Sequence, residues 1–254
     1  MVVDRVRLNT ALASAATRSG PAAALEVCRA CVAWLPMTGV AITVMAGTDR
    51  QEPVCASDDA AARIDELQFA LGDGPCVDSF TSGRAVLVAD IADEAETRWP
   101  AFAAAATDTG ARGMFVFPLR LGASRVGVLD CYRDTPGALD DAEVAGALRA
   151  ADAAVWTLLD PEQRRTVHLD DDIDVETVTS EVAGADWAHG STLARAEVHQ
   201  ATGMLIAQAD IGPAAALSRL RAAAFAEGRS IGEIADDVVS RRRRLDPDGT
   251  WHTG

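Results

Sequence analysis

Lysine is absent from this sequence: all 23 basic residues of the 254-residue chain are arginines. Together with abundant alanine, this bias is typical of the codon usage of a GC-rich bacterium. No apolar run reaches the roughly 18 residues that a membrane span requires. The N-terminus also lacks the charged, apolar and small-residue succession of a secretion signal. We therefore expect a cytoplasmic protein with no membrane contact.

Cysteine and histidine are few and scattered. The number of cysteines, five, is odd, and the chain shows no export signal. Both features favour reduced thiols over a disulfide framework. Cys28 and Cys31 form a C-x-x-C pair inside an expected helix, and two small buried side chains explain it better than metal or redox chemistry. All four histidines lie beyond residue 160, so a histidine-ligated haem or zinc site in the front part is not expected. No metal site is predicted.

Catalytic constellations are also missing. Without a partnered histidine or a glycine loop that holds phosphate, no nucleophile or acid–base pair can be assembled. The turn GDGPC at 72–76 is not a P-loop, because no Lys-Ser/Thr follows it. Its Cys76 is either a ligand or redox contact or, as the pattern favours, a structural cysteine at the start of a helix. The sequence therefore argues against an enzyme.

Negative charge is concentrated in the front of the chain. The net charge is −15, which argues against general nucleic-acid binding because a polyanion's partner needs positive surface. Residues 1–190 contain 15 arginines against 30 carboxylates, whereas residues 191–245 contain eight arginines against six. Only the final part is suited to a nucleic acid.

The first 160 residues alternate between helical and strand-like patterns. Alanine-rich helical spacing over 10–35 ends at Pro36, and further helices are expected at 60–70, 100–107 and 140–159. Short apolar or alternating runs predict strands at 40–45, 54–57, 85–88, 114–120 and 125–132, with a hairpin turn at 121–124. These patterns predict an α+β domain over residues 1–160, with a central antiparallel sheet and flanking helices.

The remaining residues predict a linker, a helical bundle and a tail. Residues 161–190 are acidic with little apolar periodicity, so we interpret them as a linker. In 191–245 the stripe of Val198, Ala201 and Leu205 predicts one amphipathic helix, and a second begins after Gly212-Pro213 and ends at Gly228. Ser230 and Glu233 form a capping box for a third helix. Three such helices must pack together, and residues 246–254 form a tail.

The segment RAEVHQATGMLIAQADIGPAAALSRLRAAAFAEGRSIGEIADDVV (195–239) resembles the ANTAR family of antitermination regulators. The matching pieces are Arg195 with QATGML (200–205), the A-x-x-x-L-R-x-x-A pattern over 216–224, and the closing helix over 231–239. The resemblance implies an all-α three-helix bundle that binds RNA. This chain has Thr202 where many members have lysine, and Leu217 where many have an aromatic residue.

The front half resembles the GAF domains that precede ANTAR domains in actinobacteria. The resemblance is carried by LQFALGDGPCVDSFTSGRAVLVADI (67–91), RWPAFAAAATDTGARGMFVFPLRLG (98–122) and VGVLDCYRDTPGAL (126–139). It implies a sensor fold with a pocket between the sheet and its covering helices. Candidate pocket residues are Cys76, Phe115, Phe117 and Tyr132, although strand aromatics are usually core. No cofactor is expected, and an unidentified small-molecule ligand is possible.

Candidate RNA-binding residues lie on the first two helices of the C-terminal segment. RNA recognition needs positive groups for phosphates and polar groups for unpaired bases. We expect these groups to be exposed beside the apolar stripes, and the candidates are Arg195, Gln200, Thr202, Gly203, Arg219 and Arg221. Gly203 is explained equally well by a close helix crossing or by close approach of RNA. The run 241–244 supplies either cations at a helix C-terminus or extra phosphate contacts.

Two functions follow from this organisation. The first is a signal-responsive RNA-binding regulator that acts by transcription antitermination, as a homodimer that grips tandem stem-loops in nascent transcripts. The alternative is a sensory module whose C-terminal helices dimerise or dock a protein partner without binding RNA. The acidic total charge and Thr202 in place of lysine support the alternative.

Overall fold

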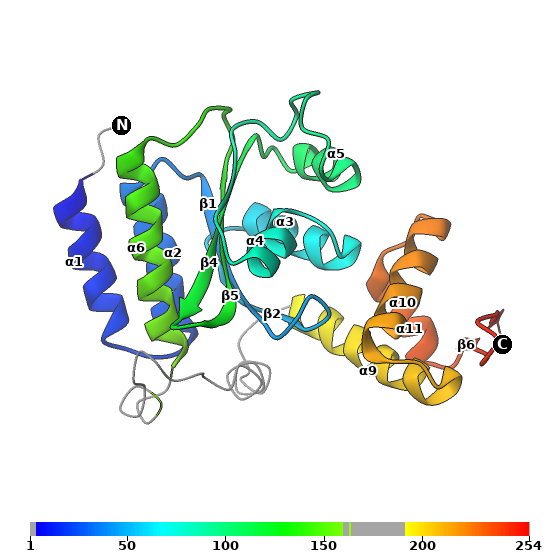
Figure 1. Ribbon diagram of the computed structural model, residues 1–254. Helices are drawn as coiled ribbons and strands as arrows, with labels where there is room; N and C mark the ends of the chain where they lie inside the picture. The colour runs from blue at the N-terminus through cyan, green and yellow to red at the C-terminus, as the bar shows by residue number, and fades with distance from the viewer. Residues whose placement is uncertain (1–3, 160–162, 164–190, 254) are drawn as a thin grey trace. The chain divides into compact units, whose positions relative to one another are not determined.

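The computed structural model describes residues 4–159, 163 and 191–253 (Figure 1). The chain divides into two compact units, Met1–Trp187 and Ala188–Gly254. The predicted linker at 161–190 lies outside the described residues apart from Gln163. No described helix is both long and apolar enough to cross a lipid bilayer.

The first unit is built on a five-stranded sheet in which every neighbouring pair is antiparallel, as predicted. The strand order is β2-β1-β5-β4-β3. The strands are β1 (Gly39–Met45), β2 (Gln51–Ala56), β3 (Val86–Val88), β4 (Gly113–Leu121) and β5 (Ser124–Arg133). The β4–β5 connection is the predicted hairpin, and Gly122 in its turn adopts a positive φ of 58°.

Helices cover both faces of this sheet (Figure 1). On one face lie α1 (Arg5–Ala16), α2 (Pro21–Trp34) and α6 (Asp141–Leu158), and on the other lie α3 (Asp59–Leu71), α4 (Pro75–Ser82) and α5 (Pro100–Asp108). The central strands are consequently buried on both sides, so β1 is buried at all seven positions. This explains why its sequence is a continuous apolar run rather than an alternation.

The single helix predicted over 10–35 is wrong, because this region forms the two helices α1 and α2. Gly20 adopts a φ of 93°, which an L side chain disfavours, and Pro21 occupies the first turn of α2. The break lets α1 fold back to pack on α2 and α6. Leu8, Leu12 and Ala15 of α1 are buried there, so the N-terminal helix belongs to the core of the first unit.

The second unit contains the three predicted helices, α9 (Ser191–Ala209), α10 (Pro213–Glu227) and α11 (Ile231–Val239). Gly228 ends α10 with a φ of 62°, and Ser230 with Glu233 completes the predicted capping box of α11. All of the predicted stripe residues whose side chains are described are buried. The bundle core therefore follows the apolar periodicity of the sequence.

A small antiparallel hairpin follows the bundle. It consists of β6 (Arg243–Leu245) and β7 (Trp251–Thr253), with Arg244 opposite His252. The segment predicted as a tail therefore includes β7. Only Arg241 and Arg242 of the basic run lie at the C-terminus of α11, because Arg243 and Arg244 belong to β6.

Candidate functional sites

The exposure predicted for Arg195 and Thr202 is wrong. Arg195 is 1% exposed and Thr202 is 8% exposed, and the Thr202 hydroxyl donates to the carbonyl oxygen of Val198 at 2.7 Å. Helix geometry gives the reason: positions 195, 198, 202, 205 and 209 recur at steps of three and four and share one face of α9. Both polar residues thus lie on the apolar stripe, and that spacing was available in the sequence.

Gln200 and Gly203 are exposed on α9, as expected. A Cβ atom built on Gly203 would meet no atom within 4 Å. No helix of the described chain crosses close to Gly203, so a close helix crossing does not explain this glycine. Close approach of RNA remains the explanation that we propose.

The two candidate arginines of α10 differ in exposure. Arg219 is exposed, and its guanidinium lies near Gly249 of the β6–β7 turn. Arg221 is half-buried and has interactions within the protein. The two side chains therefore do not form one exposed basic pair: Arg219 is exposed on α10, whereas Arg221 is only partly accessible.

Most other arginines of the second unit are held in ion pairs. Arg229 bonds to Asp237 at 2.7 Å, and Arg242 bonds to Asp236 at 2.6 Å. Arg243 bonds to Glu227 at 2.5 Å, and its Cζ lies 4.3 Å from the centre of the Trp251 ring. These pairs neutralise part of the positive charge that the composition of 191–245 suggested.

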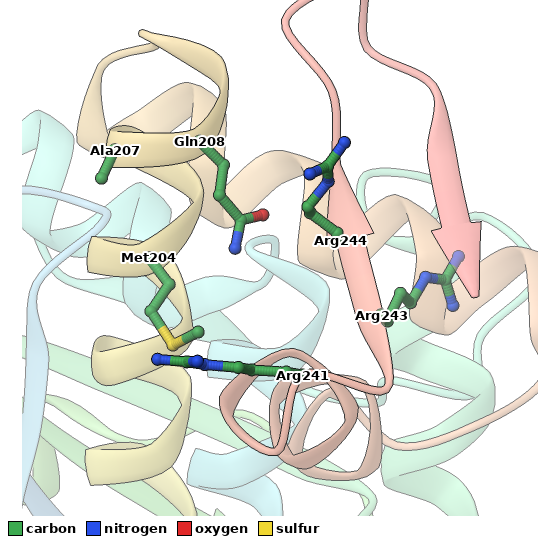
Figure 2. A pocket seen from close by; sticks show the side chains of 6 residues that line it. All are labelled: Met204, Ala207, Gln208, Arg241, Arg243 and Arg244. Atoms are coloured by element: carbon green, nitrogen blue, oxygen red, sulfur yellow. The ribbon is translucent and has the colours of Figure 1, made fainter. Parts of the chain in front are cut away.

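A hollow of about 370 Å³ lies between α9 and the segment that follows α11 (Figure 2). We call it the arginine hollow, and it is lined by Met204, Ala207, Gln208, Arg241, Arg243 and Arg244. The side-chain oxygen of Gln208 accepts the backbone N–H of Leu245 at 3.0 Å, which ties β6 to α9. Sequence reasoning missed this site because it assigned 246–254 to a tail. It therefore did not predict the β6–β7 hairpin, whose strand β6 is held against α9 by Gln208. The alternation along β6 is one of burial rather than residue type, so no sequence signal marked this strand.

The four candidate sensor-pocket residues do not line one pocket. Phe115 and Phe117 point into the core beneath α1, α2 and α6, whereas Cys76 and Tyr132 belong to clusters on the opposite face. Alternate residues of a strand point to opposite faces, and Tyr132 is paired with Met114 rather than with either phenylalanine. This correction follows from strand register, which the sequence did not specify.

A buried polar cluster lies between the sheet and helices α3 and α4. Asp130 of β5 is 5% exposed and accepts a hydrogen bond from the side-chain amide of Gln68. The Gln68 oxygen accepts the backbone N–H of Cys76 at 2.8 Å, and Thr43 donates to Asp65 at 2.5 Å. The fully buried Ser79 hydroxyl has no hydrogen-bond partner among the described residues. A charged residue inside the apolar run of β5 was the sequence signal for this cluster.

Burial raises the pKa of Asp130 to about 7. The hydrogen bond from Gln68 opposes this shift, and the nearby charge of Asp65 adds to it. Both the protonated and the ionised form of the Asp130 carboxyl are therefore populated near neutral pH. Hydrogen bonds of the Gln68 side chain link this carboxyl to the first turn of α4.

The cysteines behave as buried structural side chains. Cys28 and Cys31 are fully buried, and the Cys28 and Cys55 sulfurs lie 3.6 Å apart as free thiols. Burial raises the pKa of Cys31 to about 12, and the hydrogen bond with Cys55 raises the pKa of Cys28. The interpretation of C-x-x-C as two buried side chains is thus confirmed. Cys76 is also buried and lies in the first turn of α4, as predicted.

Residues 21–160 match the GAF domain family. That match covers more than half of the sequence. The chain belongs to the GAF domain family. Residues 191–239 match the ANTAR domain, which coincides with α9, α10 and α11. GAF domains are sensors and ANTAR domains are RNA-binding modules, so the chain is in general terms a signal-responsive regulator.

Some of the solved structures similar to this chain are GAF domains. The GAF domain of a phosphoenolpyruvate-protein phosphotransferase from Coxiella burnetii is 12% identical, with 61% of this chain and 94% of that chain covered and a TM-score of 0.47. A free methionine-R-sulfoxide reductase from Neisseria meningitidis, solved with its substrate, is 17% identical, with coverages of 64% and 91% and a TM-score of 0.45. A comparison with curated proteins finds no match.

Metal ligands do not gather in the described residues of either domain. Among those residues, no three His, Cys, Asp or Glu side chains are placed to hold one ion. The candidate sites therefore consist of the buried polar cluster in the GAF domain and the exposed surface of α9 with the arginine hollow in the ANTAR domain.

Gly203→Ala should raise stability while lowering RNA affinity. An exposed helical alanine stabilises a helix by about 1 kcal/mol relative to glycine, and the added methyl group meets no atom of the described chain. The same methyl group would obstruct an RNA backbone lying against α9. Thermal unfolding and RNA titration of the same preparation check both signs, with Ala196→Gly, also exposed on α9 but outside the lining of the arginine hollow, as the reciprocal control. Unchanged RNA affinity in Gly203→Ala would remove RNA approach as the explanation of this glycine.

Proposed function

We propose that this protein is a signal-responsive RNA-binding regulator that acts by transcription antitermination. Its ANTAR domain would bind tandem stem-loops in a nascent transcript and prevent a terminator from forming. The observation that carries the proposal is the presence of a GAF match over 21–160 and an ANTAR match over 191–239 in one chain. The proposal assigns the protein to the bacterial cytoplasm and gives it no catalytic activity.

The exposed groups of the ANTAR domain support this proposal in part. Arg219 and Arg241 are exposed and make no ion pair with any described residue, and Gln200 is exposed on α9. Guanidinium groups can hold phosphates, and an exposed amide can contact an unpaired base. Among the six residues first proposed to bind RNA, we therefore keep Gln200, Gly203 and Arg219 as contacts, and propose Arg221 as a peripheral one.

The switch requires two chains. We infer that the protein is a homodimer and that a small molecule bound by the GAF domain changes how the two ANTAR domains are placed. Such a ligand must bind one arrangement more tightly than the other. The buried polar cluster around Asp130 and Gln68 supports placing the signal on the α3–α4 side of the sheet, because it joins both helices to β5.

One observation favours the alternative of a protein-docking module. Phe225 of α10 is 78% exposed, and four arginines of the second unit are held by its own carboxylates at 2.7 Å or less. An exposed aromatic side chain is typical of a protein contact. In this function the ANTAR helices would dimerise or dock a partner without contacting RNA.

RNA binding at increasing salt separates the two functions. The full-length protein is titrated with an RNA of two tandem stem-loops in an electrophoretic shift assay. We expect binding whose affinity falls by at least tenfold between 50 and 200 mM salt, since phosphate contacts release counterions. A dimer that shows no shift, or a shift that does not depend on salt, contradicts RNA binding and leaves the docking function.

A further inference from the structure

The arginine hollow holds cationic groups of different availability. The Arg243 side chain is 9% exposed and is engaged by Glu227 and the Trp251 ring, so it serves as part of the wall. The Arg244 side chain is 66% exposed while bonded to Asp246 at 2.6 Å, and an exposed pair of this kind contributes little to stability. Arg241 is exposed and has no ion-pair partner among the described residues. Two guanidinium groups are thus available at the rim.

The backbone of Arg241 is held in an unusual conformation. Its φ is 61°, in the left-handed region, which costs a residue with a side chain roughly 1–2 kcal/mol. In Figure 2 its side chain extends from the end of α11 toward Met204 on α9. The strained turn therefore directs a cation that has no ion-pair partner among the described residues into the hollow, and such strain is common at binding sites.

The α9 side of the hollow contains an apolar patch beside Gln208. Met204 and Ala207 line it, and the exposed positions Gln200 and Gly203 precede them on the same helical face. A thioether offers a polarisable surface for an aromatic ring, and the missing Gly203 side chain leaves room for a close backbone. This combination suits a planar base beside a phosphate.

We propose that the arginine hollow binds one unpaired nucleotide of the target RNA. Its phosphate lies against Arg241 and its base lies against Met204 and Ala207, while Arg244 at the opposite rim contacts a neighbouring phosphate. The proposal rests on the RNA-binding function proposed above and extends the site from α9 to Arg241 and Arg244, which lie beyond the ANTAR match that ends at 239. The β6–β7 hairpin thereby becomes part of the RNA interface, since Gln208 fixes β6 to α9.

The test compares neighbouring arginines in the full-length protein. Arg241→Gln and Arg244→Gln are titrated with the two-stem-loop RNA beside Arg242→Gln. Arg242 is the matched control because it loses the same charge in the same segment but does not line the hollow and bonds instead to Asp236 and Asp237. We expect Arg241→Gln to weaken RNA binding about tenfold and to lower the slope of affinity against salt by about one phosphate contact. Arg244→Gln should change both quantities in the same direction by a smaller amount. Arg242→Gln should change affinity less than threefold, and Arg241→Lys should restore most of it.

Two further measurements separate the possible failures. Circular dichroism of each variant establishes that it is folded. A continuous duplex of the same length should bind the wild-type protein at least tenfold more weakly than the stem-loop RNA, because it offers no unpaired nucleotide. If the wild-type protein binds neither RNA, the proposed function fails and this inference fails with it. If it binds the stem-loops and Arg241→Gln matches Arg242→Gln, or if duplex binds equally well, the RNA function stands and the nucleotide site is wrong.

Discussion

Arg195→Ala is expected to destabilise the ANTAR domain rather than only to weaken RNA binding. The side chain is 1% exposed on the apolar face of α9 and has interactions within the protein. Truncation leaves a cavity beside Val198 and removes a buried polar group from its partners, which together cost about 2–4 kcal/mol. In a domain of this size such a loss lowers the unfolding midpoint by roughly 10 °C or more. Calorimetry of the full-length protein, with hydrogen exchange in α9, measures it.

Arg219→Ala is the control for that experiment. Arg219 is exposed on α10, so its removal should change stability by less than about 0.5 kcal/mol and lower RNA affinity through the lost charge. The two variants therefore separate a structural arginine from a contacting one. If Arg195→Ala unfolds like the wild type but no longer binds RNA, Arg195 contacts RNA and does not stabilise the fold. That result would contradict its structural role.

Asp130→Asn is expected to stabilise the GAF domain at pH 8 and to have little effect near pH 4. Burial raises the pKa of Asp130 to about 7, against about 3.9 in an unfolded chain. Between these values the folded state retains a proton that the unfolded state loses. Stability therefore falls as pH rises from about 4 to 7 and is constant above that. The asparagine cannot ionise and avoids this loss.

The expected size of the gain is at most about 4 kcal/mol, since three pKa units correspond to roughly that free energy. Urea unfolding of wild type and Asp130→Asn between pH 4 and 8 measures it as a divergence of the two curves. Asp73→Asn is the control, because Asp73 is exposed beside α4 and its variant should track the wild type. Curves for Asp130→Asn and wild type that stay parallel over this range would refute a buried carboxyl that titrates near neutrality.

The candidate sensor-pocket residues show that the sequence of a strand does not specify which face of the sheet its aromatic residues occupy. Phe115, Phe117 and Tyr132 were identified as strand aromatics, and all three are in strands. Which face each occupies depends on the register of β4 against β5, since a shift of one residue exchanges the faces. Register is set by pairing between residues distant in sequence, so a list of aromatics could not decide which of them meet.

What the sequence by itself determined is the order and identity of nearly all helices and strands and the division into a sensing part and a helical part. Apolar periodicity, caps at Ser230 and Gly228, and the turn at Gly122 act over a few residues and can be read locally. Tertiary structure alone decided that Asp130 meets Gln68 and that Arg241 and Arg244 line one hollow with Met204. These outcomes depend on which surfaces pack together, because burial and charge pairing are properties of contacts between segments rather than of either segment.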